Sequence, residues 1–403
     1  MSGARLVVVG IGADGWTGLG ETARGAVVGA DQVVGSERQL ALLPDGLPAR
    51  RPWPSPIAPL VDELVDLSSG TVCVLASGDP MLHGIGATLA RRVDHERLTI
   101  IPHPSALSLA CARLGWPVVE VELVTTLARP VEAVIAALQP RRRVIVYVAG
   151  ADGAARVAAA VTEAGYGPSR MIVLEQLGGD GERRTETTAV AWGDASADPL
   201  HLVALDCVRA PGTPLWPRTP GLPDAAYATD GQLTKTHVRA VTLAALGPAP
   251  NARLWDVGAG SGSIAIEWLR AEPTATAVAV ERDPARAERI AANARSLGVP
   301  ELTLVRGDAP FALDDLPPPD AVFIGGGVTV PGMVDRCWAP LAPGGRIVAN
   351  AVTLESEQVL LDARARLGGT LTRIEIAHAE PVGSFTGWRA QMPVAQWRAE
   401  KPL

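Results

Sequence analysis

The chain has 403 residues, of which 47% are hydrophobic and 20% charged, and its formal net charge is −7. That length favours two or three globular domains, and that composition excludes a disordered or fibrous chain. We expect no nucleic-acid partner, because nucleic-acid binding depends on a dominant positive field.

The apolar runs and the cysteines exclude further classes of protein. No apolar run reaches the roughly 18 residues that a membrane-spanning helix needs, so we expect no membrane association. The N-terminal residues lack the apolar core of a secretory signal, and we expect a cytoplasmic protein. The four cysteines lie far apart and form no metal-binding spacing, so we expect reduced thiols and no metal site.

The N-terminal half alternates apolar runs with helix-like segments. Apolar strands separated by helices are typical of a covered parallel sheet, so we expect a mostly parallel sheet here. The expected strands are residues 6–9, 72–76, 98–101, 144–148, 171–174 and 202–205, and the expected helices include residues 131–138 and 154–164.

Residues 209–223 interrupt this alternation. They include five prolines and two glycines, which excludes a core helix or a central strand. We therefore predict a linker at residues 208–222, between a first domain of residues 1–207 and a second domain of residues 223–403.

The second half resumes the alternation of strands and helices. This alternation predicts a doubly wound sheet that ends in two paired strands. Because both halves alternate strands with helices, both are expected to have an α/β fold. The expected helices are residues 234–246 and 263–269, and the expected strands are residues 253–257, 277–280, 302–305, 321–324 and 346–349, with the pair at 370–377 and 389–397.

Short motifs follow three of the expected strands in the first half. They are Gly10-Ile11-Gly12, Ser77-Gly78-Asp79-Pro80 and Pro102-His103-Pro104-Ser105. In that order they resemble the tetrapyrrole methylase fold, in its precorrin C5-methyltransferase branch. The resemblance covers about residues 4–207 and implies two α/β subdomains with S-adenosylmethionine bound between them. It also implies the binding residues, which are Gly10, Gly12, Ser77, Gly78, Asp79 and Ser105, with Asp79 as a candidate catalytic residue.

Two positions of the first half depart from that family pattern. The first loop has Ala13-Asp14-Gly15, where the family usually has Gly-Pro-Gly, and His103 replaces a usual glycine. A contact between His103 and the substrate and a structural role for this side chain are both open.

A glycine-rich turn follows the first expected strand of the second half. Asp256 precedes the run Gly258-Ala259-Gly260-Ser261-Gly262, and a helix is expected to begin at Ser263. The Gly-x-Gly-x-Gly spacing suits a nucleoside without a pyrophosphate, unlike the Gly-x-Gly-x-x-Gly of dinucleotide binders. Acidic residues then end the next two strands, where they can accept hydrogen bonds from ribose and adenine. Together these residues look like the S-adenosylmethionine site of class I methyltransferases: Asp256, Gly258, Ala259, Gly260, Gly262, Ser263, Glu281, Asp308 and Ala309.

Longer stretches of the second half carry a more specific resemblance. Residues 230–240, 254–264, 307–310 and 322–326 resemble the precorrin C15-methyltransferase and decarboxylase family of cobalamin biosynthesis. The match runs from about residue 221 to the C-terminus and implies a class I, Rossmann-like methyltransferase. It implies that Gln232 and Thr234 bind S-adenosylmethionine and that Lys235 is catalytic.

The residue after Lys235 and Thr236 departs from that family pattern. The family commonly has Thr-Lys-x-Glu, which is also a helix capping box, whereas this chain has Thr234-Lys235-Thr236-His237. The box therefore lacks its acidic member. His237 is a candidate acid or base beside the substrate, and a tolerated surface substitution is the alternative.

Together the two resemblances imply two S-adenosylmethionine sites and two methyl transfers to one tetrapyrrole. They imply methylation of precorrin-6B at C5 and C15, with loss of the ring C acetate carboxyl, to give precorrin-8. Bridge carbons of a reduced tetrapyrrole are enamine-like nucleophiles, so the enzyme has chiefly to position the methyl donor and exclude water. The resemblance also implies a homo-oligomer.

That substrate carries many carboxylates, so an acidic protein must gather local cations to bind it. The candidates are Arg38, Arg91, Arg92, Arg183, Arg184 and Arg239, with Lys235. Candidate general bases are Asp79, Asp230, His237 and Glu267.

Three other functions are weighed against this one. The first alternative is an S-adenosylmethionine-dependent methyltransferase that acts on another small molecule, which leaves the fused first half unexplained. A nicotinamide-dependent dehydrogenase conflicts with the glycine spacing. A non-catalytic S-adenosylmethionine sensor needs an effector module, and nothing in the sequence resembles one.

Overall fold

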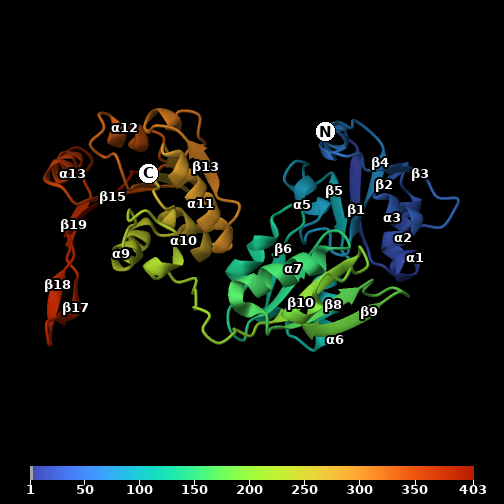
Figure 1. Ribbon diagram of the computed structural model, residues 1–403. Helices are drawn as coiled ribbons and strands as arrows, with labels where there is room; N and C mark the ends of the chain where they lie inside the picture. Colours follow the sequence, from blue (N-terminus) through green and yellow to red (C-terminus); the bar gives the residue numbers. More distant parts are fainter. Residues whose placement is uncertain (1–2) are drawn as a thin grey trace. The chain divides into compact units, whose positions relative to one another are not determined.

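The computed structural model describes residues 3–403. The chain forms two compact units (Figure 1). Unit 1 runs to Ala128 and resumes over Pro140–Pro211, and unit 2 comprises Arg129–Gln139 and Gly212–Leu403. Residues 129–139, which precede the proline-rich linker in the sequence, thus belong to the second unit.

The first sheet of unit 1 has five strands in the order β3-β2-β4-β1-β5, all parallel. Alternate residues of β1 enter two separate cores, with Val7 and Val9 on one face and Leu6 and Val8 on the other. Both faces are covered, which explains the continuous apolar run. The sequence does not predict β2 or β3, because both are short and β3 is mostly polar. The elements are β1 (Arg5–Ile11), α1 (Gly15–Gly18), α2 (Glu21–Val28), β2 (Gln32–Gly35), α3 (Glu37–Ala41), β3 (Ala49–Pro52), α4 (Ala58–Asp66), β4 (Thr71–Ser77), α5 (Ile85–Ala90) and β5 (Leu98–Ile101).

The second sheet of unit 1 has the order β6-β7-β10-β8-β9, and only β6 and β7 are parallel. The expectation of a mostly parallel sheet is therefore wrong for this part. No long helix joins β8 to β9, and antiparallel strands can be joined by short connections. The elements are α6 (Ala106–Leu114), η1 (Val118–Glu120), β6 (Val121–Thr125), β7 (Arg143–Tyr147), α7 (Gly153–Val161), the π-helical turn η3 (Thr162–Tyr166), β8 (Arg170–Glu175), β9 (Arg183–Thr188), α8 (Ala189–Trp192) and β10 (His201–Asp206).

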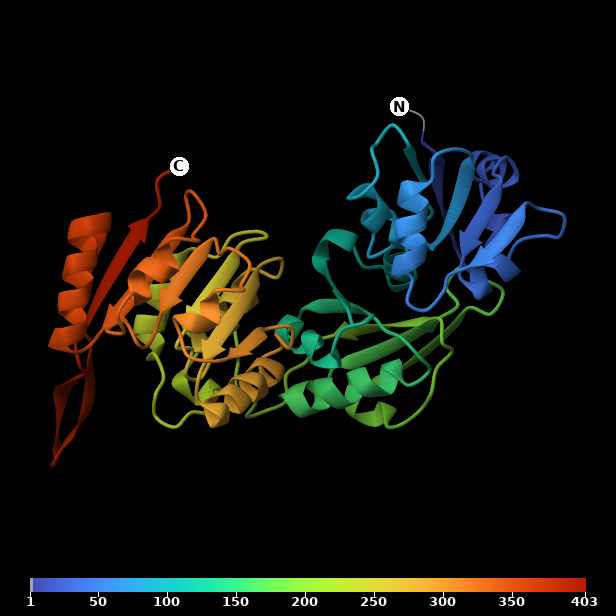
Figure 2. The same ribbon diagram turned by 90° about the horizontal axis from the view of Figure 1, so that it is seen from above.

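Unit 2 has one seven-stranded sheet in the order β13-β12-β11-β14-β15-β19-β16. The first five strands are parallel, and at one edge β19 pairs antiparallel with both β15 and β16. Helix α13 packs against β15, β16 and β19 (Figure 2). The elements are η2 (Val131–Ala137), η4 (Asp224–Ala226), α9 (Thr236–Leu246), β11 (Arg253–Val257), α10 (Ser263–Ala271), β12 (Thr276–Glu281), α11 (Pro284–Ser296), β13 (Thr303–Arg306), η5 (Phe311–Leu313), β14 (Ala321–Ile324), α12 (Met333–Trp338), β15 (Arg346–Ala351), α13 (Leu354–Leu367), β16 (Thr370–Ile374) and β19 (Val394–Glu400).

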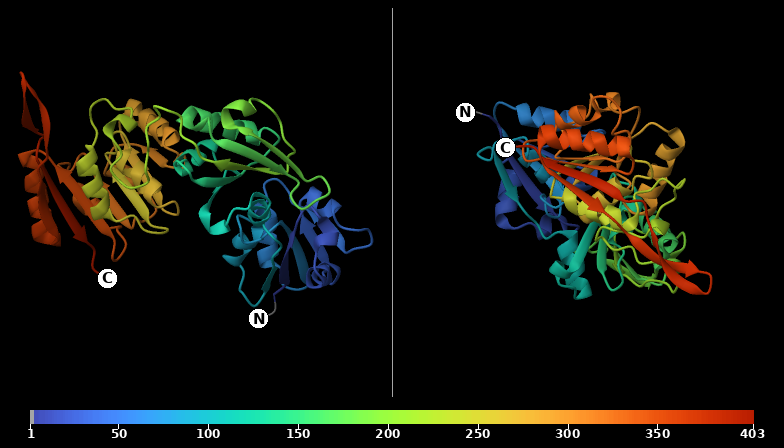
Figure 3. Two further views of the ribbon diagram at one scale, coloured as in Figure 1. Left: turned by 90° about the horizontal axis from the view of Figure 1, so that it is seen from below. Right: turned by 90° about the vertical axis from the view of Figure 1, so that its left-hand side faces the viewer.

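A two-stranded hairpin, β17 (Ala377–Val382) and β18 (Phe385–Ala390), forms a separate sheet between β16 and β19. It extends away from the seven-stranded sheet of unit 2 (Figure 3). The expected pairing of residues 370–377 with 389–397 is therefore split, because β16 pairs with β19 while β17 pairs with β18.

No helix or strand occurs between Asp206 and Asp224. Within residues 3–403, none of the helices has the length and apolar character needed to cross a bilayer. The same residues hold no cluster of three or more His, Cys, Asp or Glu side chains suited to a metal ion.

Candidate active sites

The cavity of unit 2 lies where the strands β11, β12 and β14 end. Its volume is about 1120 Å³, and it opens at the carboxyl edge of the parallel strands, where ligands bind in open α/β sheets. Most of the expected binding residues of this half line it: Gln232, Thr234, Lys235, Gly258, Ala259, Gly260, Ser263, Glu281, Asp308 and Ala309.

The glycine-rich loop brings its backbone to the wall of this cavity. Gly258 has a φ of +71°, and a Cβ atom on it would lie 2.9 Å from the Cα of Gly326. Only glycine fits there without strain, and its backbone is left open to a ligand. Gly262 does not line the cavity. A Cβ atom on it would lie 2.8 Å from the side chain of Ile290, a residue of α11. Gly262 therefore serves helix packing.

Two acidic side chains behave differently at this cavity. Glu281 is buried, and its two oxygens accept hydrogen bonds from the backbone N–H groups of Gly260 at 2.9 Å and Asp283 at 3.0 Å. Each oxygen keeps a further lone pair for a ligand hydroxyl. The Asp308 side chain is 71% exposed and lies 3.9 Å from Arg282, so it stands at the rim.

Asp256 lies beneath the loop and outside the cavity lining. Its Oδ2 accepts a hydrogen bond from the N–H of Ala265 at 3.0 Å, which fixes the start of α10 to the end of β11. Its Oδ1 has no hydrogen-bond partner within residues 3–403. Burial raises the pKa of this carboxyl to about 7.

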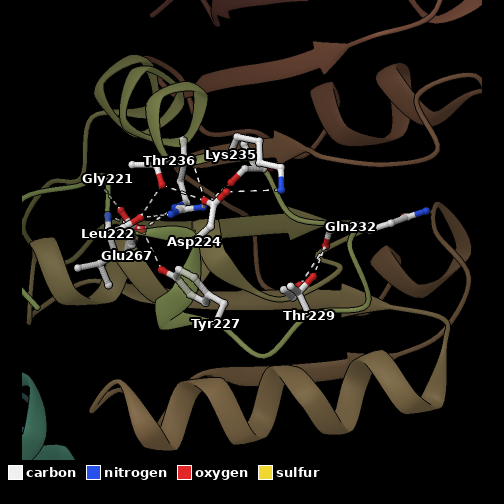
Figure 4. Close-up of polar contacts among 12 residues, drawn as sticks. Gly221, Leu222, Asp224, Tyr227, Thr229, Gln232, Lys235, Thr236 and Glu267 are labelled. Atoms are coloured by element: carbon white, nitrogen blue, oxygen red, sulfur yellow. Dashed lines mark hydrogen bonds and ion pairs between the residues drawn. The ribbon is translucent and has the colours of Figure 1, made fainter. Parts of the chain in front are cut away.

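Residues 221–235, here called the strap, form one wall of the cavity through Gln232, Thr234 and Lys235. The strap is attached to helix α10 by the buried carboxylate of Glu267 (Figure 4). Glu267 accepts hydrogen bonds from the N–H groups of Gly221 at 2.5 Å and Leu222 at 3.1 Å and from the Tyr227 hydroxyl at 2.8 Å. It also forms an ion pair at 2.6 Å with Arg239 of α9, and both side chains are almost fully buried.

The cavity of unit 1 has a volume of about 590 Å³ and lies at the ends of β1 and β4, near β7. It brings together five of the expected residues, which are Gly12, Ser77, Gly78, Asp79 and Ser105. Gly10 does not line it. A Cβ atom on Gly10 would lie 2.2 Å from the carbonyl oxygen of Gly78, so this glycine allows the two loops to touch.

Local hydrogen bonds hold the loops of this cavity in place. The Ser105 hydroxyl caps α6 by accepting from the N–H of Ser108 at 3.0 Å. Asp79 Oδ1 accepts from the N–H of Met81 at 2.8 Å, which closes a turn. These carboxyl and hydroxyl groups are thereby held rigidly at the cavity wall.

Comparison with known proteins assigns the chain to a family. A family model described as tetrapyrrole (corrin/porphyrin) methylases matches residues 5–191, and one described as a precorrin methyltransferase domain matches residues 225–401. A precorrin-6Y C(5,15)-methyltransferase (decarboxylating) from Mycobacterium tuberculosis is 49% identical over 403 residues, covering 98% of this chain and 100% of the relative. This chain belongs to the precorrin-6Y C(5,15)-methyltransferase (decarboxylating) family.

A further relative and a solved structure are similar to this chain. A protein of the same name from Sinorhizobium is 45% identical, covering 97% of this chain and 95% of the relative. The crystal structure of the C-terminal domain of a precorrin-6Y C5,15-methyltransferase from Rhodobacter capsulatus is 50% identical, with a TM-score of 0.44, and covers 46% of this chain and 100% of that domain. Membership of this family makes the enzyme a methyltransferase that uses S-adenosylmethionine, as the resemblances predict, and the dehydrogenase alternative is set aside.

Two candidate functional residues form a buried ion pair and do not line the cavity. Arg239, a candidate cation for substrate carboxylates, and Glu267, a candidate general base, are buried against each other and do not line the cavity. The sequence places Arg239 four residues after Lys235, as if on one helix face. However, α9 begins only at Thr236, and Arg239 points inward to the strap.

The start of α9 is stabilised by an acid from another segment instead of by a capping box. Asp224 Oδ1 accepts hydrogen bonds from the N–H of Thr236 at 3.0 Å and from its hydroxyl at 2.9 Å. His237 is exposed, does not line the cavity, and lies with its ring centroid 5.4 Å from that of His378. This placement favours the surface alternative over an acid or base role.

Asp230 is also a poor general base. It forms ion pairs with Arg286 at 2.8 Å and Arg289 at 3.2 Å. The hydrogen bond from Arg286 is the main reason that the pKa of Asp230 falls to about 2. The candidate bases of the second half are thus each engaged or outside the cavity.

The candidate arginines of unit 1 separate into two groups. Arg92, Arg183 and Arg184 form ion pairs with Asp62, Glu175 and Glu186, and Arg91 is exposed outside the cavity lining. Arg38 alone of these five candidates lines the cavity.

Sequence reasoning missed Gln39, Tyr147 and His201, which also line the unit 1 cavity. Tyr147 ends β7, and its hydroxyl accepts a hydrogen bond from the N–H of Leu107 at 2.8 Å. Burial raises the pKa of this hydroxyl, so it remains protonated at neutral pH. Its place at the end of an apolar strand was the available signal.

Proposed function

We propose that each unit carries out one methylation of precorrin-6B. Unit 1 methylates C5, and unit 2 methylates C15 and removes the ring C acetate carboxyl as carbon dioxide, so that the product is precorrin-8. The observation that carries this proposal is the presence of a separate strand-end cavity in each unit, of about 590 and 1120 Å³. Each unit also contains most of the match to a different methylase model.

The residues of the unit 2 cavity fit S-adenosylmethionine. The Gly258 loop leaves its backbone accessible, because a Cβ atom there would meet Gly326. Glu281 offers carboxylate lone pairs suited to ribose hydroxyls, and Gln232 and Thr234 close the same cavity. When bound, S-adenosylmethionine supplies an electrophilic methyl group on its sulfonium.

In unit 1 the matching fit rests on Gly12, Gly78 and Asp79. Gly78 has a φ of +60°, and a Cβ atom on it would lie 3.3 Å from the Cα of Ser105. The neighbouring turn fixes the Asp79 carboxylate at the wall, where it can accept from a ligand amino group. We therefore propose a second S-adenosylmethionine site here.

The chain contributes position and exclusion of water more than proton transfer, because the bridge carbons are themselves nucleophilic. Lys235 lines the unit 2 cavity, is half exposed, and lies 3.5 Å from Asp224. We propose that its ammonium group binds the acetate carboxylate. When the carbon–carbon bond breaks, the electron pair passes into the conjugated imine of the tetrapyrrole and carbon dioxide leaves. Lys235 must hold the acetate without overstabilising it, and partial solvation by water fits that need.

The mass of the tetrapyrrole after reaction tests this division of labour. The wild-type enzyme with precorrin-6B and S-adenosylmethionine is expected to add two methyl groups and remove one carboxyl group. Gly258→Val and Gly78→Val each place a side chain on a positive-φ residue at one cavity. Gly212→Val is the matched control, because this positive-φ glycine has open space around it.

We expect Gly78→Val to lose only the C5 methyl and Gly258→Val to lose the C15 methyl together with decarboxylation. If one methylation must precede the other, a variant blocked at the first step leaves the substrate unchanged. A mixture of the two variants then restores the full product, because each supplies the step that the other lacks. Failure of the mixture, with both variants folded, contradicts the assignment of one step to each unit.

We also propose that the enzyme forms a homo-oligomer in the cytoplasm. The hairpin of β17 and β18 exposes Val382, Phe385 and Trp388, whose exposed fractions are 63%, 80% and 79%. Exposed apolar clusters of this kind mark interaction surfaces. The buried thiols of Cys73, Cys111 and Cys337 fit a reducing compartment. Sedimentation velocity of the wild type and of Phe385→Ser/Trp388→Ser tests the oligomer, and an identical sedimentation coefficient for both contradicts a role of the hairpin.

A further inference from the structure

The wall of the unit 1 cavity carries a fixed cluster of three polar side chains, Arg38, Gln39 and Ser77. Gln39 Oε1 accepts a hydrogen bond from the N–H of Ser36 at 2.8 Å, so the amide orientation of Gln39 is settled. Its Nε2 consequently donates to the Ser77 hydroxyl oxygen at 3.1 Å. Arg38 Nη2 donates to the same oxygen at 2.9 Å.

This cluster presents hydrogen-bond donors to the cavity. Because the Ser77 oxygen already accepts two hydrogen bonds, its own hydroxyl proton is left to donate. Arg38 has five N–H donors in its guanidinium group, and its one hydrogen bond to a side chain or backbone of residues 3–403 is that to Ser77. A ligand that meets this cluster must therefore supply acceptors.

The charge of Arg38 is not balanced by a nearby carboxylate. No acidic group of the described chain lies within 4.0 Å of its guanidinium, in contrast to Arg92, Arg183 and Arg184. The acidic group with most influence on Arg38 is Asp198, whose carboxylate accepts from Gln176 at 2.9 Å. Burial lowers the pKa of Arg38, but a guanidinium remains charged at neutral pH. A partly buried cation without a partner is costly unless a ligand anion completes it.

We propose that Arg38 and the Ser77 hydroxyl bind a carboxylate of a unit 1 ligand. The planar guanidinium suits a carboxylate, with which it can form two parallel hydrogen bonds. The inference rests on the proposed function of unit 1, which supplies two sources of this group. One source is an acidic side chain of the tetrapyrrole, and the other is the α-carboxylate of S-adenosylmethionine.

Two substitutions at Arg38 test the proposal in the full-length enzyme. Arg38→Gln removes the charge but keeps donors for Ser77, and Arg38→Lys keeps the charge but loses the planar fork. Arg92→Gln is the control, because Arg92 lies in the same unit and pairs with Asp62 outside the cavity. We expect Arg38→Gln to raise one KM of the C5 methylation at least tenfold, Arg38→Lys to raise it less, and Arg92→Gln to leave it within twofold.

The affected KM identifies the source of the carboxylate. A rise in the KM for the tetrapyrrole alone assigns an acidic side chain of the substrate, and a rise in the KM for S-adenosylmethionine alone assigns the cofactor. Binding of S-adenosylhomocysteine and of methylthioadenosine, which lacks the carboxylate, gives a second measurement. If the cofactor is the source, Arg38→Gln weakens only the former.

Two results would overturn the proposal. One is that both KM values stay within twofold of wild type in Arg38→Gln. The other is that both rise equally together with a loss of thermal stability, which would make Arg38 a structural residue. C15 methylation and decarboxylation by unit 2 serve as an internal reference. A wild-type enzyme without C5 methylation would instead contradict the proposed function, and direct binding would still test Arg38.

Discussion

His103 Nε2 lies 3.5 Å from Asp14 Oδ2, across the two loops that follow β5 and β1. The same two side chains surround Gly12, because a Cβ atom there would lie 2.5 Å from Asp14 Oδ1 and 2.8 Å from His103 Cε1. Asp14 belongs with Ala13 to the first loop that departs from the family pattern, and His103 is the departure in the second loop. They are spatial neighbours, so the departure in one loop is accommodated by the departure in the other.

This pairing predicts that the two residues are energetically coupled. Asp14 Oδ1 is buried without a hydrogen-bond partner in the described part of the chain, so removal of His103 takes away the ring nitrogen that lies 3.5 Å from Oδ2 of the same carboxyl group. His103→Ala is therefore expected to destabilise the enzyme more than Asp14→Ala. We expect a coupling free energy of about 0.5 kcal/mol, in the range of partly exposed ion pairs, from urea unfolding of both single variants and the double variant. Additive effects of the two substitutions would show that the pair is not coupled.

The buried pair of Glu267 and Arg239 predicts a defect confined to unit 2. In Glu267→Gln the amide oxygen can replace Oε1, but the amide NH2 then faces the N–H of Gly221, which donates to Oε2 in the wild type. Loss of this charge partner leaves the buried Arg239 with only Asp224, at 3.4 Å, as a neighbouring carboxylate in the described residues, at a cost of about 3 kcal/mol in the free energy of unfolding. Because the strap lines the cavity, the KM for S-adenosylmethionine in C15 methylation is expected to rise.

The control for this variant is Glu288→Gln on the exposed face of α11. It is expected to change neither the free energy of unfolding nor either KM. C5 methylation should also be unchanged in Glu267→Gln, because unit 1 has its own cavity. A KM in the wild-type range, with a destabilised unit 2, would show that the pair supports the fold without positioning the strap.

The fold was predictable wherever local pattern and buried environment agree. Strand β11 (Arg253–Val257) and strand β14 (Ala321–Ile324) match their expected bounds, because strands buried on both faces are continuous apolar runs. Strand β9 carries polar side chains along its whole length, so it has no apolar run from which a strand could be predicted. Strand order and direction in that sheet depend on contacts distant in sequence, which periodicity does not report.

The candidate sites were predictable where a residue type is required by the backbone. Gly258 and Gly78 combine a positive φ with a close contact, and both were identified from their place at strand ends. The charged residues were harder to assign, because an arginine that binds a ligand and one that pairs internally look alike in sequence. Only the structure shows that Arg239 forms an ion pair with Glu267 and that Arg38 forms no ion pair with a carboxylate of residues 3–403.

The contact of Asp224 with α9 predicts how the helix start is stabilised. In Asp224→Ala the N–H and hydroxyl of Thr236 lose their acceptor, and Lys235 loses its neighbour at 3.5 Å. Loss of a helix cap costs about 1 kcal/mol, so the urea midpoint of unit 2 is expected to fall. Asp224→Asn keeps an oxygen acceptor and is expected to recover most of that loss. Equal destabilisation by both variants would show that the charge of Asp224, and not its cap, matters.

The buried carboxyl of Asp256 predicts a pH dependence of unit 2. Its pKa of about 7 lies above the value of roughly 3.9 expected in an unfolded chain. Between these two values the folded state retains a proton that the unfolded state releases, so rising pH favours unfolding. The contribution of Asp256 to stability is thus greatest below about pH 4 and is lost as pH rises towards 7, by at most about 1.4 kcal/mol per pH unit.

Asp256→Asn tests this directly, because the amide does not titrate and keeps an oxygen for the N–H of Ala265. We expect the free energy of unfolding of the wild type to fall relative to that of Asp256→Asn as pH rises from 5 to 7. All other titrating groups are common to both proteins and cancel in this difference. A difference that is constant across this range would show that Asp256 is already ionised at pH 5, and that its Oδ1 has found a partner such as an ordered water.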